Sequence, residues 1–448
     1  MSPKKRWTYL PLLLVVLALV AAGCRAAEQE MQPPEDQEQE PAGDDDAQGA
    51  QTDVGVTEEP CPNAVNEDNG CIYLGIISDL TVGPFAPLAG PITEAQAAFW
   101  RRVNEVGGIA GYDIDATTYV RDNEFNAEVH NRVFQEIRGE VLALAQTLGS
   151  SPTLAILDDM RDDSIVGAPA SWNSAWEFED VILESGANYC FESMNGVDWA
   201  TEQVGTDISL LHIHFPDDYG NDAAAGSEIA AQAHGIEYSA QETPPGRDQQ
   251  AGAIEAVVSQ SPDVLFITTG PQEMVEIVGR AAARGWQGLV LGSGPTWNPA
   301  LLGTDAAPAL EAMYHQVGPW GTWGTDTAGH QAMRDALGDV SEINDGYTAG
   351  WVWSYPMRAA LEAAAENGDL TREGLLQAVS ALTEVDYEGM LPNEAGNYAD
   401  EPEQGAFRQS IIAGVDTESE TGVSTIEDFF TGPTAEEHAL DGPCYELG

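Results

Sequence analysis

Basic residues are scarce in this sequence, and their scarcity limits what the protein can bind. Its 448 residues include 17 Lys and Arg against 74 Asp and Glu, a formal net charge of −57 at pH 7. A polyanionic surface repels nucleic-acid phosphates and anionic lipid headgroups, so neither is expected as a partner. The composition is typical of proteins adapted to high salt, where screening removes self-repulsion. An acidic exported protein without salt adaptation would have the same signature.

Motifs that carry chemistry are also missing. The sequence has no HExxH, no phosphate-binding P-loop and, in its main body, no G-x-S-x-G or G-x-G-x-x-G. His212 and His214 share one face of a predicted strand, but such residues are more often buried and partnered within the fold than metal ligands. We therefore expect no enzyme activity, no cofactor and no metal. A hydrolase using a cleft serine would need a histidine partner, and none is recognisable.

The N-terminus has the features of an export signal. A basic start precedes an apolar run over 10–20, which is about half the length of a membrane span. The small residues before Cys24 resemble a bacterial lipobox, which predicts a signal peptide over 1–23 and a lipid on Cys24 as the only anchor. An ordinary signal peptide with an incidental cysteine is the alternative. Residues 24–60 are acidic and poor in large apolar groups, which predicts a disordered tether.

Four further cysteines fit an oxidising compartment. An even number allows two disulfides with three possible pairings. Cys61 and Cys71 are separated by turn-forming residues, which favours their pairing and leaves Cys190 to pair with Cys444. A zinc site is the competing interpretation, but the sequence has no CxxC and no nearby histidine at ligand spacing.

The main body alternates short β-rich segments with amphipathic helices. This pattern predicts an α/β fold with parallel sheets covered on both faces, and the length predicts two Rossmann-like lobes. Strands are expected near 72–77, 114–120, 141–145, 208–215, 235–239, 263–269 and 288–291. Helices are expected from about 93 to 106, 126–140, 152–160, 222–233, 248–259, 272–284 and 347–366, followed by a shorter helix near 374–382 and a loop-rich tail. Ligands of open parallel sheets bind at the carboxyl ends of the strands, so function is expected in the loops there.

Several segments resemble the type I periplasmic solute-binding proteins, in particular the branched-chain amino acid receptors of ABC importers. The segments are 74–89, which looks like the first strand and loop of that family, 104–111 after the first helix, Asp218-Tyr219-Gly220, 262–264, 283–285 and Gly346-Tyr347. The resemblance runs from about residue 72 to 407. It implies a Venus-flytrap with a hinge between two lobes, a first lobe over 61–205 and 330–400, and a second over 206–329 and 401–448.

The resemblance also implies a function. The protein would be an exported substrate-binding lipoprotein, on the outer face of the cytoplasmic membrane or facing the periplasm, that captures an amino acid or a related small carboxylate or amide. Its partners would be that small molecule and an ABC permease, and the protein would be a monomer. A ligand-sensing lipoprotein with a membrane signalling partner is the alternative, because one fold serves both roles.

Twelve residues are candidates for ligand contact by this resemblance. They are Phe85, Ser150, Ser151, Thr153, Ala170, Ser171, Trp172, Tyr219, Thr269, Gly294, Trp297 and Tyr347. The hydroxyl residues could instead cap a helix, and the tryptophans could pack within a lobe. Gly294 stands where amino-acid binders carry an acidic residue for the ligand ammonium, and no aromatic residue follows Thr269. These departures favour a more apolar ligand, such as a carboxylate without an amine.

Overall fold

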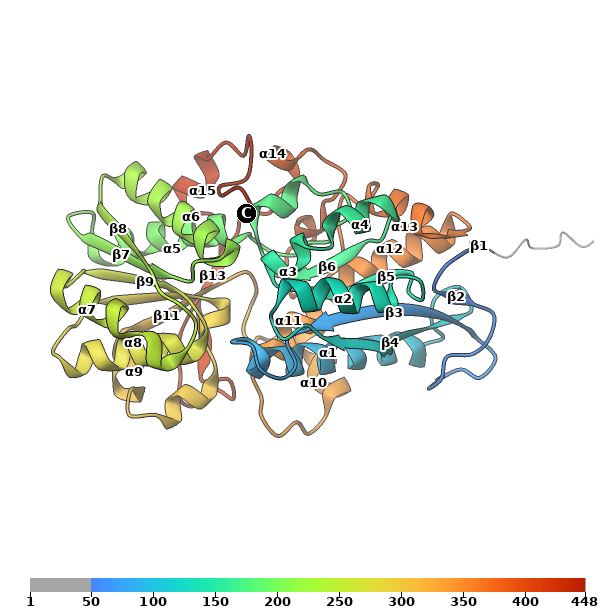
Figure 1. Ribbon diagram of the computed structural model, residues 1–448, viewed down its shortest axis with the longest axis horizontal. Helices are drawn as coiled ribbons and strands as arrows, with labels where there is room; N and C mark the ends of the chain where they lie inside the picture. Colours follow the sequence, from blue (N-terminus) through green and yellow to red (C-terminus); the bar gives the residue numbers. More distant parts are fainter. Residues whose placement is uncertain (1–49, 448) are drawn as a thin grey trace, which may run out of the picture. The chain divides into compact units, whose positions relative to one another are not determined.

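Two sheets organise the part of the chain that the structure describes. The structure is a computed structural model and describes residues 50–447. The predicted signal peptide, Cys24 and the first part of the predicted tether lie outside these residues. Among residues 50–447, no helix combines the length and the apolar composition that a membrane span requires. Each sheet carries its own set of helices, which defines a first and a second lobe (Figure 1).

The first lobe is built on parallel strands in the order β4-β3-β5-β6, with the short β2 antiparallel to β3. Its strands are β2 (Val56–Thr57), β3 (Gly70–Ser78), β4 (Tyr112–Asp122), β5 (Ala143–Leu148) and β6 (Gly167–Ala170). Its helices are α1 (Ala86–Glu105), α2 (Ala127–Ile137), α3 (Ser150–Leu154), α4 (Leu157–Asp162), α10 (Ala328–Leu337), α11 (Gly346–Val352), α12 (Ser354–Glu366) and α13 (Arg372–Val379). Every residue of β5 is buried, as expected for a parallel strand covered on both faces.

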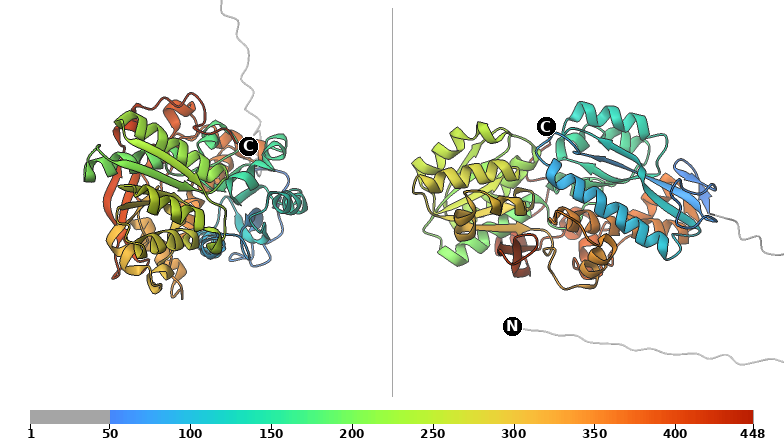
Figure 2. Two further views of the ribbon diagram at one scale, coloured as in Figure 1. Left: turned by 60° about the vertical axis from the view of Figure 1, so that its left-hand side comes forward. Right: turned by 90° about the horizontal axis from the view of Figure 1, so that it is seen from below.

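The second lobe has a seven-stranded sheet in the order β8-β7-β9-β10-β11-β13-β14. Its strands are β7 (Ser209–His214), β8 (Glu237–Glu242), β9 (Val264–Thr268), β10 (Leu289–Ser293), β11 (Tyr314–Gly318), β13 (Ser410–Val415) and β14 (Val423–Phe430). Its helices are α5 (Tyr189–Val204), α6 (Asp218–His234), α7 (Ala251–Gln260), α8 (Pro271–Ala283), α9 (Ala307–Met313) and α15 (Pro433–Glu437). Separate apolar clusters lie under α7–α9 and under α5, α6 and α15, so helices cover both faces of this sheet (Figure 2). The last two strands are antiparallel to their neighbours.

The predicted parallel α/β architecture is confirmed, and most predicted strands lie within two residues of an observed one. The first helix begins at Ala86 rather than near Thr93. The predicted helix over 347–366 is interrupted at Trp353, between α11 and α12. The predicted loop-rich tail contains β13 and β14, whose antiparallel pairing the strand–helix pattern did not indicate.

Two predicted domain boundaries need correction. Residues assigned to the disordered tether form β1 (Gln51–Thr52), which pairs with β12 (Asp369–Leu370), and β2, which pairs with β3. Backbone pairing with an existing strand edge orders this segment despite its polar composition. Helix α5 was assigned to the first lobe, but it packs on α6, β10, β11 and β13 of the second. The first crossover therefore precedes α5, whereas the boundaries near 330 and 400 stay predictions.

Both predicted disulfide pairings are present. Cys61 is bonded to Cys71, and Cys190 at the start of α5 is bonded to Cys444 near the C-terminus. The one group of three possible metal ligands in residues 50–447 is Cys61, Cys71 and Asp115, and its two sulfurs are already joined in a disulfide. His212 hydrogen-bonds Ser227 and Thr268 through its two ring nitrogens, in keeping with a structural role.

Candidate binding cleft

A pocket lies where the carboxyl ends of strands from both sheets meet. Its volume is about 90 Å³, and its walls come from the loops after β3, β5, β6, β7, β10 and β11 together with α1 and α11. Two local features of the chain form these loops. Gly149 adopts a φ of 98° between β5 and α3, which turns Ser150 toward the pocket. A Cβ on Gly220 would lie 2.1 Å from the carbonyl oxygen of Phe215, so only glycine lets α6 begin so close to the end of β7.

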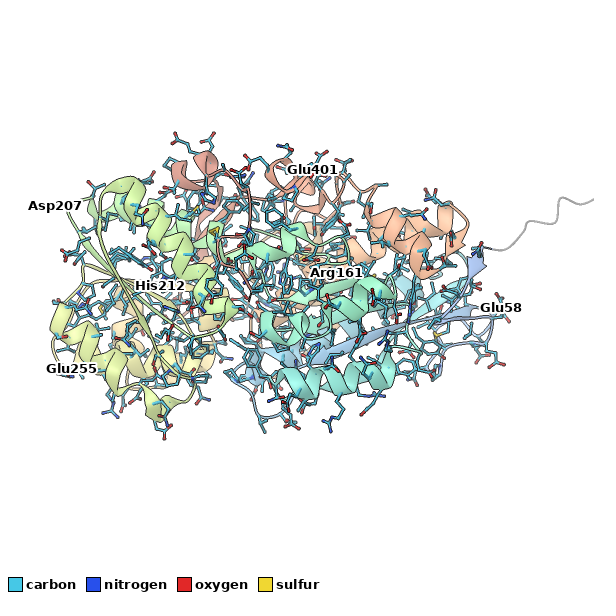
Figure 3. All side chains as sticks on the ribbon, turned by 45° about the horizontal axis from the view of Figure 1, so that its top comes forward. Glu58, Arg161, Asp207, His212, Glu255 and Glu401 are labelled. Atoms are coloured by element: carbon cyan, nitrogen blue, oxygen red, sulfur yellow. A yellow bond between two sulfur atoms is a disulfide. The ribbon has the colours of Figure 1, made fainter. Side chains whose placement is uncertain are left out.

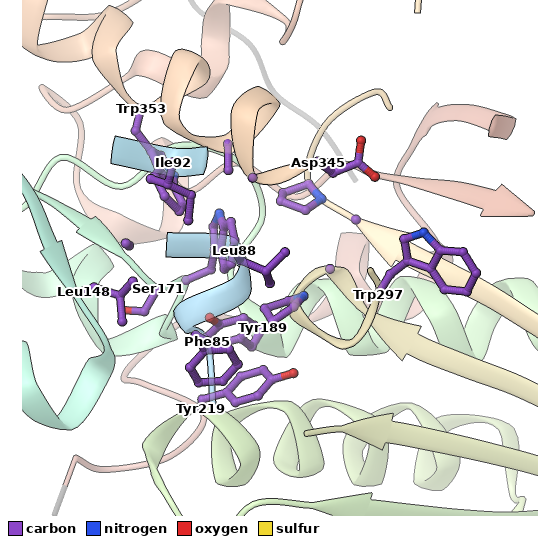
Figure 4. A pocket seen from close by; sticks show the side chains of 18 of the residues that line it. Phe85, Leu88, Ile92, Leu148, Ser171, Tyr189, Tyr219, Trp297, Asp345 and Trp353 are labelled. Atoms are coloured by element: carbon purple, nitrogen blue, oxygen red, sulfur yellow. The ribbon is translucent and has the colours of Figure 1, made fainter. Parts of the chain in front are cut away.

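Aromatic side chains make up much of the pocket wall. Trp172, Trp320 and Trp353 surround one end, with ring centroids 5.0–5.7 Å apart. Phe85 and Tyr219 pack edge to face near the other end, with ring centroids 6.0 Å apart, and Figure 4 shows both beneath Leu88. Such walls suit an apolar ligand.

The hydroxyl groups of the predicted serine loop have different roles. Ser150 is 3 % exposed, and its Oγ has no hydrogen-bond partner among the described residues. Ser151 Oγ donates to Asp218 Oδ2 over 2.6 Å and so links α3 of the first lobe to α6 of the second. Ser171 Oγ accepts a hydrogen bond from Trp176 Nε1. Ser150 therefore offers the hydroxyl that is open to a ligand.

Two carboxyl groups line the pocket, and no described residue lining it is Lys, Arg or His. Asp345 precedes α11, and its Oδ1 accepts a hydrogen bond from the Trp323 amide. Its buried Oδ2 accepts no hydrogen bond of ordinary geometry, although the Thr421 hydroxyl lies near the carboxyl group and opposes the rise of its pKa. Burial raises the pKa of Asp345 to about 6. Asp217 accepts from the Gly220 amide at the start of α6, and burial raises its pKa to about 6 as well. At neutral pH both are mainly ionised, which gives the pocket a negative potential.

Gly294 lies in the pocket wall without a side chain to offer, as the sequence indicated. The fully buried Glu192 of α5 lies close enough to the Gly294 amide for that amide to influence its carboxyl group. Burial raises the pKa of Glu192 well above its usual range, and the Gly294 amide opposes that shift. Glu192 does not line the pocket, so it does not replace the missing acidic ligand group.

Nine of the twelve predicted residues line the pocket. They are Phe85, Ser150, Ser151, Ala170, Ser171, Trp172, Tyr219, Gly294 and Trp297. The other three do not line it and have internal partners: Thr153 bonds Thr147, Thr269 donates to the Gly270 carbonyl, and Tyr347 donates to Glu94. Among the nine, Trp297 stacks on Tyr314 and donates to the Thr421 carbonyl, so its indole N–H is already used.

Sequence reasoning missed several lining residues. Leu88 and Ile92 follow Phe85 at helical spacing on α1, a signal that was lost because that helix was expected to start near Thr93. Gln316 and Trp320 come from β11 and the segment after it, where no strand was predicted. No local pattern marks Asp345, because an acidic residue before a helix is common in so acidic a chain.

Comparison with known proteins identifies the family. Residues 72–416 match the family model described as periplasmic binding protein. The chain belongs to the periplasmic binding protein family. Its members are solute-binding transport receptors rather than enzymes, which confirms the expectation that the protein is not an enzyme. Family membership also confirms the predictions that the protein is exported and that it binds a small molecule for an ABC transporter.

Solved structures agree with this assignment. A fatty acid ABC transporter substrate-binding protein from Thermomonospora curvata is 27 % identical, with a TM-score of 0.80 over 87 % of this chain and 97 % of that one. A branched-chain amino acid ABC transporter protein from Thermus thermophilus with bound valine is 17 % identical, with a TM-score of 0.69 over 82 % of this chain and 98 % of that one. A leucine binding protein from Thermotoga maritima is 15 % identical, with a TM-score of 0.65 over 80 % of this chain and 99 % of that one. No curated protein matches the chain in sequence.

Proposed function

We propose that this periplasmic binding protein captures an apolar α-amino acid in its zwitterionic form and delivers it to an ABC permease. The observation that carries the proposal is a set of four unpartnered polar atoms in a pocket with largely aromatic walls. Two are donors, Ser150 Oγ and Trp353 Nε1, and two are acceptors, Gln316 Oε1 and Asp345 Oδ2. A carboxylate needs donors and an ammonium needs acceptors, so a zwitterion uses both kinds.

Charge and size support the same ligand class. With two carboxyl groups and no basic residue in the lining, a ligand with net negative charge is repelled, whereas a zwitterion is neutral and presents its ammonium to Asp345. The pocket volume of about 90 Å³ lies below the ~300–1,000 Å³ of drug-sized sites. A small amino acid suits this space better than a long acyl chain. Gly294 has no carboxyl group to pair with a ligand ammonium, and Asp345 takes that role in this proposal.

An apolar carboxylate without an amine is the second candidate. It is favoured by the 27 % identity to a protein described as a fatty acid ABC transporter substrate-binding protein. Leucine and 4-methylpentanoate share one carbon skeleton and differ only in the amino group, so they separate the two candidates.

Isothermal titration of the purified protein with these two ligands tests the proposal. We expect leucine to bind more tightly than 4-methylpentanoate. Asp345→Asn should weaken leucine by about 10–100-fold, because a hydrogen bond to a charged group contributes about 1.5–3 kcal/mol. The same variant should strengthen 4-methylpentanoate, because it removes a negative charge that repels the ligand carboxylate. Ser150→Ala should weaken both ligands. Ser193→Ala is the matched control, because Ser193 Oγ is equally buried and unpartnered but lies outside the pocket lining. Tighter binding of 4-methylpentanoate would instead establish the second candidate.

The affinity for leucine should depend on pH with a definite sign. Because the pKa of Asp345 is raised to about 6, its charge is lost as the pH falls through 6. We expect leucine to bind less tightly at pH 5 than at pH 8 in the wild type, with a smaller change in Asp345→Asn. A stronger affinity at pH 5 would contradict an ammonium contact with this residue.

Contacts between the lobes support a closing mechanism. Ser151 and Asp218 join α3 to α6, and Phe85 packs on Tyr219 across the same gap. A ligand held between these surfaces favours the closed form because it touches both lobes, and the closed form is then presented to the permease. We also propose that the chain is a monomer held at the membrane by a lipid on Cys24. A radiolabelled fatty acid incorporated by the wild type but not by Cys24→Ala would test the anchor.

A further inference from the structure

A second cavity lies away from the cleft, beside two of the segments that connect the lobes. Its volume is about 430 Å³. Its lining residues come from three places: the segment 176–186, which leads to α5, the segment 395–407, which includes α14 (Pro402–Gly405) and leads to β13, and Val379 and Ser380 at the end of α13. Six of its lining residues carry carboxyl groups: Glu177, Glu179, Asp180, Glu184, Asp400 and Glu401. No described residue lining it is Lys, Arg or His. Figure 3 shows Glu401 at the surface by α14.

Partners within the fold account for three of these carboxyl groups. Glu179 pairs with Arg161, whose Nη2 lies 2.5 Å from Glu179 Oε1. Glu177 accepts from Asn188 Nδ2 over 3.1 Å, and Asp400 accepts from Asn397 Nδ2 over 2.8 Å. The remaining groups include Asp180 and Glu401 at the exposed rim.

Glu184 differs from the other five. Its residue is only 7 % exposed, and neither carboxyl oxygen has a hydrogen-bond partner among the described residues. Only its backbone carbonyl is used, as the acceptor for the Tyr398 hydroxyl. A buried carboxyl group without a partner is costly, and burial together with the charges of Glu177 and Asp222 raises the pKa of Glu184 well above its usual range. A cation in the cavity would remove this cost.

The walls and spacing indicate which cation fits. Trp176, Phe178, Tyr398 and Phe407 line the cavity, and aromatic faces attract ammonium groups. Among residues 50–447, no three of these carboxyl groups come close enough together to form a group that could hold a metal ion. We propose that this cavity binds an organic cation bearing ammonium groups, with Glu184 as its buried anchor and the rim carboxylates Asp180 and Glu401 around its exposed end.

Spermidine is a suitable probe, and high salt is essential to the test. A protein of net charge −57 attracts any polycation diffusely. At 1 M NaCl the Debye length is about 3 Å, so diffuse attraction is screened and contact in a buried site persists. Isothermal titration of the full-length chain under this condition should reveal one saturable spermidine site.

Three variants, each lacking one negative charge, test whether spermidine binds in this cavity. We expect Glu184→Gln to weaken spermidine at least 10-fold and Asp180→Asn to weaken it about 2–5-fold. Glu237→Gln removes the same charge from exposed strand β8 and should leave the affinity unchanged. If Glu184→Gln fails to fold, the contrast between Asp180→Asn and Glu237→Gln still tests the site. Absence of a saturable site, equal affinity in all variants, or saturable binding of Ca²⁺ but not spermidine would overturn the proposal.

Discussion

Asp222, in the first turns of α6, provides a direct test of how burial controls the stability of this acidic protein. The residue is fully buried and accepts hydrogen bonds from the backbone amide and the hydroxyl of Ser174. Burial raises its pKa from 3.8 to about 7, although the Ser174 bonds and the Cys190 amide oppose the shift. Asp222→Asn keeps a side-chain acceptor for the Ser174 amide and removes the charge.

The direction of the pH effect follows from linkage. Between about pH 4 and pH 7 the native state holds a proton on Asp222 that the unfolded chain has lost, so stability falls as the pH rises through this window and levels off above it. With a pKa of about 7 in the native state and 3.8 in the unfolded state, the free energy of unfolding loses roughly 2–3 kcal/mol between pH 5 and pH 8 through this group. The asparagine variant should not lose this contribution.

Urea unfolding followed by tryptophan fluorescence at pH 5 and pH 8 measures the effect. The free energy of unfolding of Asp222→Asn, relative to the wild type, should rise by roughly 2–3 kcal/mol from pH 5 to pH 8. Asp207→Asn, at an exposed position labelled in Figure 3, should show no comparable change. The stability of the variant should keep some dependence on pH, because the pKa of Glu177 is also raised to about 7. The charge of Asp222 contributes to that shift. A relative stability that is the same at both pH values would refute the reasoning.

Two further predictions concern packing and the C-terminal tie. A Cβ on Gly226 of α6 would lie 2.2 Å from the carbonyl oxygen of Cys190, so Gly226→Ala should lower the free energy of unfolding by at least about 2 kcal/mol. The control is Gly252→Ala on α7, where a Cβ would have nothing within 4 Å and should raise the free energy of unfolding by about 0.5–1 kcal/mol. Equal effects of the two substitutions in thermal unfolding would contradict the close approach of α6 to Cys190. The Cys190–Cys444 disulfide joins residues 254 positions apart, so Cys444→Ser should cost about 5 kcal/mol by loop-closure entropy. A loss below about 1 kcal/mol in urea unfolding would show that the unfolded chain is not restrained by this bond.

Much of the architecture could be predicted from local patterns. Runs such as β7 and β9 are short, β-rich and bounded by polar turns, and each is followed by an amphipathic helix, which is sufficient to predict a parallel α/β arrangement. The glycine-hydroxyl sequence at Gly149-Ser150 and the Tyr219-Gly220 pair mark two strand ends whose residues line the cleft. These signals are local because each reports the burial of one segment or a backbone conformation that few residues adopt.

The sequence by itself determined the alternation of strands and helices, the acidic surface, the pairing preference of the cysteines and most of the aromatic wall of the cleft. Only the tertiary structure decided that α5 covers the second sheet, that Asp345 brings a carboxyl group into the cleft, and that Glu184 lacks a partner. The reason is physical: the spacing of apolar residues shows that one face of a segment is buried, but it does not show which other segment covers that face. A pocket's charge depends on which distant strand ends converge, and no local pattern carries that information.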